Sequence, residues 1–309
     1  MLSLERCRSG SYGRPAADGE YSKLFNSQSG NPKVAGFGAG PFALFQTAWH
    51  HRSLILRLAR REIDARYRGS MLGIVWAVLN PILMLAVYTF VFSVVFQARW
   101  GTPSGAAGES NTEFALLLFS GLILFNVLGE CLNRAPGLLL ENVSYIKKVV
   151  FPLEILPLVS LAVALFNAGI GFVILVVFHL LVAGLPPLTA LLLPLVLVPL
   201  CLTTLGLSWF FAAAGVFLRD IRQVVGVGVT VLMFLSPIFY PMTAIPERFR
   251  AILHLNPMTA ILEQSKDLLF WGRIPSPVEW GLATLAAWVV AWLGYLWFMK
   301  TRRGFADVV

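Results

Sequence analysis

Residues 57–81, RLARREIDARYRGSMLGIVWAVLNP, join a basic segment to a long apolar one without a linker. In a helix, the charged side chains of the first half fall on one face and the aliphatic side chains on the other. The charged set is Arg57, Arg60, Arg61, Asp64 and Arg68. This pattern predicts an amphipathic helix over residues 51–70 that lies in the membrane interface, with its apolar face in the lipid. No charged residue follows until Arg99, and a run of that length exceeds the roughly 20 residues that cross a bilayer.

The composition indicates a membrane protein. The chain has 309 residues, of which 57% are hydrophobic and only 13% charged, whereas a soluble domain has about 25% charged residues. The net charge of +8 comes from lysine and arginine beside apolar runs. Such residues set the orientation of a membrane protein, so we expect no nucleic-acid partner.

Six apolar runs predict six transmembrane helices. Only helices satisfy their own backbone hydrogen bonds inside lipid, so the expected fold class is an all-α integral membrane protein. Residues 155–218 carry no charge, but Pro186 and Pro187 divide this run into two helices. The expected spans are 72–96, 114–133, 153–182, 189–217, 224–244 and 280–299.

The expected organisation has three parts. Residues 1–50, rich in Gly, Ser and Pro, predict a flexible cytoplasmic tail before the interfacial helix. Residues 71–309 form the six-span domain, with a cytoplasmic coupling loop at 134–151 and an external gate region at 236–279. Short apolar stretches on either side of Asn256 and Pro257 predict two short re-entrant gate helices.

Most lysines and arginines of the short loops fall on one side of the predicted spans. The side with this excess is the cytoplasmic one, and an even number of spans then places both termini in the cytoplasm. We therefore expect a multi-pass membrane protein with both termini in the cytoplasm.

The motifs of nucleotide hydrolysis and metal catalysis are absent. A phosphate-binding loop ends in Gly-Lys-Ser/Thr, and this chain has no Gly-Lys dipeptide. We predict no catalytic and no metal-binding residue. Ionisable residues in spans mark ion pathways, but Glu130 and Glu154 stand at span ends and are interpreted as solvated. A pore driven by energy from a partner is the better interpretation.

Glu62 and Arg66 interrupt the apolar face of the predicted interfacial helix. Being four residues apart, they can neutralise each other. The alternative is that this face meets a groove of another protein. The sequence leaves both interpretations open, with a slight preference for the first.

Several ordered motifs resemble the transmembrane component of type-2 ABC exporters, and in particular the polysaccharide (O-antigen) permeases. They are RREIDARYRGSMLGIVWAVLNPILMLAVYTFVFSVVF at 60–96, NVSYIKKVVFPLEILPLVSLAVALFN at 142–167, FLRDIRQVV at 217–225 and SPIFYPMTAIPERFRAILHLNPMTAILE at 236–263. The resemblance runs from about residue 52 to the C-terminus. It implies a homodimer that carries a lipid-linked polysaccharide, with ATP and Mg bound by a separate cytoplasmic ATPase subunit.

The resemblance also implies roles for residues. The expected ATPase-coupling residues are Glu62, Arg66, Arg134, Glu141, Tyr145, Lys147 and Lys148. Arg57, Arg60 and Arg61 are expected at a glycolipid headgroup entrance. The expected channel and external gate residues are Trp209, Phe210, Pro237, Phe239, Tyr240, Pro241, Asn256 and Pro257. A wide, uncharged, aromatic path suits a sliding glycan, because a charged wall would hold it at one place.

Three alternatives remain at the level of sequence. A capsule or teichoic-acid exporter shares these motifs, and a drug or small-lipid exporter shares the fold. A membrane-embedded glycosyltransferase is the alternative outside transport, and it would need carboxylates near the interface that hold a metal or act as a base.

Overall fold

The computed structural model describes residues 42–68, 72–95, 111–142, 151–254 and 256–305, together with Gly40. These residues belong to one compact unit, Ala39–Val309. Regular structure in the described part of the chain is entirely helical, as predicted. The helices are α2 (Ala43–His50), α3 (Arg52–Tyr67), α4 (Trp76–Tyr88, continued by a π-helical stretch Thr89–Val95), α5 (Asn111–Leu138), α7 (Leu156–Val182), α8 (Leu193–Phe217), α9 (Ile221–Leu235), α10 (Glu247–His254), α11 (Pro257–Lys266) and α12 (Pro277–Thr301).

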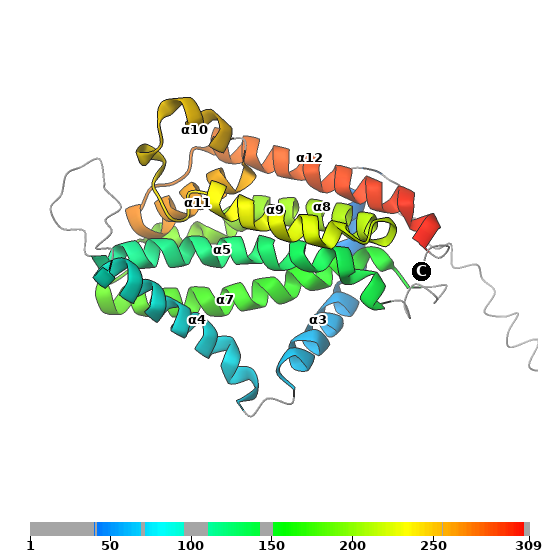
Figure 1. Cartoon of the computed structure of the whole chain (residues 1–309), viewed down its shortest axis with the longest axis horizontal. Coiled ribbons are helices and arrows are strands. Elements are labelled where there is room, and N and C mark those ends of the chain that lie inside the picture. The colour runs from blue at the N-terminus through cyan, green and yellow to red at the C-terminus, as the bar shows by residue number, and fades with distance from the viewer. Residues whose placement is uncertain are drawn as a thin grey trace, which may run out of the picture. The chain divides into compact units, whose positions relative to one another are not determined.

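Helix α5 is the centre of the bundle. It packs against α7 and α8 along its length, and α4, α9 and α11 also contact it (Figure 1). At one end, Gly215 of α8 lies so close to Pro136 of α5 that an added Cβ would overlap the Pro136 backbone. Gly206 of α8 and Gly294 of α12 permit a second close crossing in the same way. Small residues bring these helices together because lipid supplies no hydrophobic drive for their association.

In the described part of the chain, five helices are long and apolar enough to cross a membrane: Gly73–Phe92, Glu113–Leu138, Leu153–Val182, Leu188–Phe217 and Pro277–Gly304. They correspond to five of the six predicted spans. The remaining one, 224–244, is shorter than expected, because α9 ends at Leu235. Ser236 precedes Pro237 and is extended (φ −90°, ψ 143°), as the ring of a following proline requires. The 15 residues of α9 span about 22 Å, less than the ~30 Å of the hydrocarbon core.

Two predicted boundaries are wrong. The coupling loop was expected from residue 134, but α5 continues through Pro136 to Leu138, so Arg134 is helical. The predicted tail, 1–50, ends earlier than expected, because residues 43–50 form α2. Residues 1–39 of that tail and residues 143–150 of the loop lie outside the described part of the chain.

The amphipathic helix α3 is present, but its apolar face does not point to lipid as predicted. Ile55 and Ala59 form a buried cluster with Ile155, Val159 and Val163, at and just after the start of α7. The aliphatic pattern of α3 is therefore satisfied by another helix. A helix neighbour and a lipid chain are equally apolar, so the sequence pattern could not distinguish them.

Candidate functional site

A cavity of about 540 Å³ lies between α4, α5, α7 and α9. Its lining is mostly apolar and aromatic, with Tyr88 of α4 and Phe119 and Phe125 of α5 among the larger side chains. Four asparagines also reach it: Asn80, Asn126, Asn133 and Asn167. Among the residues that the structure describes, Glu130 is the only charged side chain in this lining. The cavity can therefore hold a group that has both apolar faces and hydrogen-bonding edges.

The polar side chains of the cavity form a stripe on α5. Between residues 114 and 139, only Asn126 and Asn133 are exposed, and only Glu130 and Arg134 are partly exposed. The spacing of 126, 130 and 133 places three of these on one side of the helix. Every other side chain in this stretch is buried. The stripe is thus the one face of the central helix that the fold leaves open.

Glu130 links this cavity to α3. Its Oε1 accepts a hydrogen bond from Arg66 Nη2, which also forms an ion pair with it. Its Oε2 accepts one from Asn167 Nδ2 of α7, 3.2 Å away. The carboxylate is therefore held between α3 and α7 and is not simply solvated, as the sequence suggested.

A second ion pair, like that between Arg66 and Glu130, joins α3 to α5. Glu62 of α3 pairs with Arg134 of α5, one helical turn beyond Glu130. The interpretation that Glu62 and Arg66 neutralise each other within α3 is thus wrong, because each finds its closest partner on α5. A spacing of four residues in a helix permits Glu62 and Arg66 to pair. The Arg134 guanidinium is closer to Glu62, however, and the Glu130 carboxylate is closer to Arg66.

The other residues expected at the cytoplasmic surface are only partly described. Glu141 forms a largely exposed pair with Arg222 at the start of α9, 3.2 Å apart. Tyr145, Lys147 and Lys148 lie outside the described residues, so their coupling role stays a prediction. Arg57, Arg60 and Arg61 line a surface cavity of about 390 Å³ along α3 together with Asp64 and Arg68, and their role at a headgroup entrance stays a prediction.

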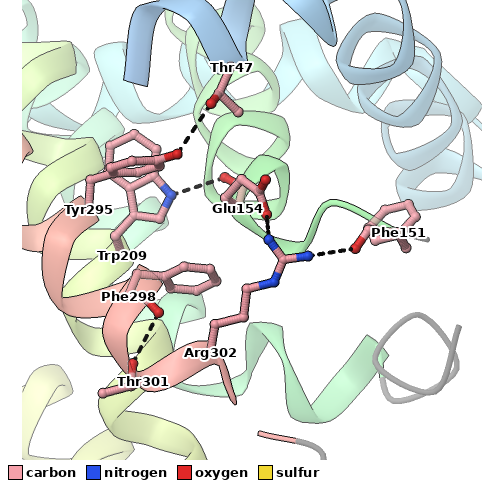
Figure 2. A network of polar contacts seen from close by, with 8 residues as sticks. All are labelled: Thr47, Phe151, Glu154, Trp209, Tyr295, Phe298, Thr301 and Arg302. Atoms are coloured by element: carbon pink, nitrogen blue, oxygen red, sulfur yellow. Dashed lines mark hydrogen bonds and ion pairs between the residues drawn. The ribbon is translucent and has the colours of Figure 1, made fainter. Parts of the chain in front are cut away.

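Trp209 and Phe210 do not line the cavity as expected. Trp209 is fully buried, and its Nε1 donates a 3.0 Å hydrogen bond to the Glu154 carbonyl (Figure 2). Its ring meets that of Tyr295 edge to face, with 5.2 Å between centroids. The ring of Phe210 contacts that of Trp297 on α12 in a tilted arrangement, with 5.7 Å between the ring centroids. An aromatic side chain in an apolar span packs against neighbours as readily as it lines a path.

The same cluster contains Glu154, which is buried rather than solvated. Its Oε2 accepts a 2.8 Å hydrogen bond from Arg302 Nη1 at the end of α12 (Figure 2). Arg302 Nη2 donates a longer one, 3.5 Å, to the Phe151 carbonyl. These contacts fasten the chain that follows the coupling loop to the end of α12.

The predicted gate region contains two short helices, α10 and α11, with Asn256 as the N-cap of α11 and Pro257 as its first residue; that they are re-entrant stays a prediction. Asn256 caps α11 by accepting a hydrogen bond from Met258 N, and its Nδ2 donates to Ser236 Oγ, 2.9 Å away. The Pro237 carbonyl accepts a hydrogen bond from the buried Lys266. Ser236 and Lys266 were not predicted as gate residues, because Lys266 stands between Ser265 and Asp267 in a polar stretch and its burial is set by the fold.

The remaining gate residues fold back on α9. Phe239 stacks on Phe234 with 5.8 Å between centroids, and Tyr240 OH donates to the Phe234 carbonyl at 2.9 Å. Pro241 precedes a short turn at Met242–Ala244. Lys266 lies outside the span-length helices. Burial lowers its pKa and the nearby Glu263 partly offsets this, so that the net pKa is about 7. Whether this region opens as an external gate stays a prediction.

The chain resembles proteins of known function. Residues 53–270 match the family model described as ABC-2 type transporter. An O-antigen export system permease protein, RfbA, of Myxococcus xanthus is 26% identical over 268 residues, covering 86% of this chain and 99% of the relative. RfbA of Klebsiella pneumoniae is 27% identical over 223 residues (72% and 82%). The polysialic acid transport protein KpsM of Escherichia coli is 22% identical over 244 residues (79% and 91%).

Proposed function

Because the chain belongs to the ABC-2 type transporter family, we propose that it is the membrane-spanning permease subunit of an ATP-driven exporter of a lipid-linked polysaccharide. O-antigen is the first candidate for the glycan, since the RfbA relatives of Myxococcus xanthus and Klebsiella pneumoniae are O-antigen export permeases. The KpsM relative supports a capsule-type glycan as the second candidate. The membrane would be the bacterial inner membrane, with both termini in the cytoplasm.

The polar stripe of α5 is the observation that carries this proposal. A glycan has hydroxyl groups at its edges and apolar C–H faces. The amides of Asn126 and Asn133 can exchange hydrogen bonds with the hydroxyls, while the partly exposed Tyr88 offers a flat apolar surface. Neutral amides hold a sugar less tightly than paired charges would, so the chain can both bind and move on.

The energy would come from a separate ATPase subunit that binds ATP and Mg. This chain has no phosphate-binding Gly-Lys motif. The ion pairs Glu62–Arg134 and Arg66–Glu130 join α3 to the helix that lines the cavity. A displacement of α3 by the ATPase subunit would therefore be transmitted to α5 and so to the cavity. In this proposal a second copy of the chain completes the path, because α4 and α9 leave apolar faces exposed beside the cavity.

The test is a deletion strain together with a reconstituted system. In the deletion strain we expect the lipid-linked glycan to accumulate on the cytoplasmic side of the membrane, and the compound that accumulates identifies the substrate. In proteoliposomes we expect export only with the ATPase subunit and ATP. Accumulation of a drug or a free lipid would contradict the choice of substrate. Glycan elongation by the purified chain alone would indicate a glycosyltransferase instead.

A further inference from the structure

Helix α2 has two faces of different character. Leu44 and Thr47 are buried, with 3% and 1% of their surface exposed. Phe42, at the N-cap, and Phe45 and Trp49 are 65%, 48% and 73% exposed. The four-residue spacing of Phe45 and Trp49 places these two rings on the side opposite Leu44 and Thr47, whereas Phe42 stands at the edge of this face, next to Trp288 of α12. A short helix with a large aromatic face directed outward needs a partner for that face.

The buried face of α2 is fixed to α12. Thr47 Oγ and Tyr295 OH form a 3.2 Å hydrogen bond, and both residues are almost fully buried (Figure 2). The ring of Phe42 lies against that of Trp288, with 6.1 Å between centroids. Trp288 and Tyr295 are two turns apart on α12, so α2 runs along the side of this helix. Its outward face therefore has a defined direction.

The surroundings of α2 identify what covers that face. Helix α12 is one of the five span-length helices, and Leu285, Val289 and Leu293 on its outer side are exposed. In a membrane, these side chains contact lipid. Helix α2 lies along the same helix, so its aromatic face continues this lipid-facing surface.

The charges that follow α2 locate the surface at a headgroup boundary. The guanidinium carbon of Arg52 lies 4.6 Å from the centre of the Trp49 ring, a cation–π contact. The basic face of α3 begins one turn later. Aromatic rings next to arginines are typical of segments at the boundary between acyl chains and headgroups.

We propose that α2 is a membrane anchor whose aromatic face enters the lipid at the headgroup boundary, beside the basic end of the bundle. The anchor lies before residues 53–270, so the family match does not account for it. Helix α2 thereby connects the start of α3 both to α12 and to the bilayer surface. The proposal depends on the helices crossing a membrane and not on the identity of the exported substrate.

The experiment measures what surrounds residue 45. The full chain, with its three native cysteines replaced, carries a spin label at Phe45→Cys and is placed in nanodiscs of phosphatidylethanolamine and phosphatidylglycerol. Collision rates are then measured with oxygen, which concentrates in lipid, and with a water-soluble nickel chelate. Leu293→Cys on the outer side of α12 is the lipid control, and Arg60→Cys on the basic face of α3 is the water control.

We expect the label at position 45 to collide with oxygen several-fold more often than with nickel, as at position 293 and opposite to position 60. Preference for nickel would show that water covers this face and would overturn the proposal. Low rates with both reagents would show that protein covers it, either a second copy or another subunit, and would also overturn it. If Phe45→Cys does not give a monodisperse protein, Trp49→Cys tests the same face.

Discussion

Two glutamates near the basic end of the bundle, Glu154 and Glu130, are each paired with an arginine from another helical segment, yet their surroundings differ. The side chain of Glu154 is 11% exposed, and its backbone carbonyl accepts the hydrogen bond from Trp209, whose ring contacts Tyr295. The side chain of Glu130 is 25% exposed and faces a cavity of about 540 Å³. The first arrangement fixes the ends of helices, and the second leaves a charged group where a substrate can pass. The comparison separates residues that hold the fold from residues that line the proposed path.

The largest effect is expected from Glu154→Gln. This change leaves Arg302 without its ionic partner in a mostly buried place, and we expect a loss of about 3 kcal/mol in the free energy of unfolding. Chemical unfolding in detergent measures it. Glu141→Gln is the matched control, because its pair with Arg222 is exposed and contributes less than about 1 kcal/mol. Equal losses in the two variants would remove the distinction between buried and exposed pairs.

A smaller effect, on transport instead of stability, is expected from Asn126→Leu combined with Asn133→Leu. Two lost hydrogen bonds to the glycan at about 1 kcal/mol each would slow export about 30-fold. Both side chains are exposed in the structure, so the unfolding free energy should change little. Export assayed in proteoliposomes checks this. Unchanged export by a correctly folded double variant would mean that the stripe does not contact the substrate.

Trp209→Phe should lower stability and leave export unchanged, the reverse of the asparagine double variant. The change removes the hydrogen bond from Nε1 to the Glu154 carbonyl, and we expect a loss of about 1.5 kcal/mol in stability. Export per folded molecule should stay normal, because Trp209 is fully buried and away from the cavity. A change in export rate at unchanged stability would instead indicate that Trp209 contacts the substrate.

Among the variants that remove a buried or half-buried ion pair or a buried hydrogen bond, Glu130→Gln is expected to lower stability the least. Its pair with Arg66 is partly solvated, so we expect a loss of about 0.5 kcal/mol. The unfolding free energy is measured beside that of Glu154→Gln under identical conditions. A loss as large as that of Glu154→Gln would show that Glu130 also holds the fold, and the comparison would fail.

The sequence predicted the spans well, because the length of an apolar run is a direct physical requirement of the bilayer. It failed where tertiary contacts decide the outcome. Helix α5 passes the expected end, and its last turn is buried, with Pro136 packed closely against Gly215 of α8. The apolar face of α3 turned out to contact α7, and Trp209 to be buried, because hydrophobicity alone does not name the neighbour.

The polar stripe was accessible from the sequence but was not found. Asn126, Glu130 and Asn133 stand at helical spacing in an otherwise apolar run, and polar side chains in such a run mark functional surfaces. The two asparagines are neither charged nor aromatic, so the charge and aromatic content of the run do not single them out. What the sequence could not supply is the opposing wall of the cavity, which comes from α4 and α7.

The central claim is that the substrate passes along the open stripe of α5, and one crosslinking measurement tests it most directly. A photo-crosslinking amino acid is placed at position 126 and, separately, at position 210, in cells where export is stalled by an inactive ATPase. We predict glycan adducts at position 126 and none at position 210, where Phe210 packs on Trp297 away from the cavity. Adducts at position 210 without adducts at position 126 would contradict the proposed path.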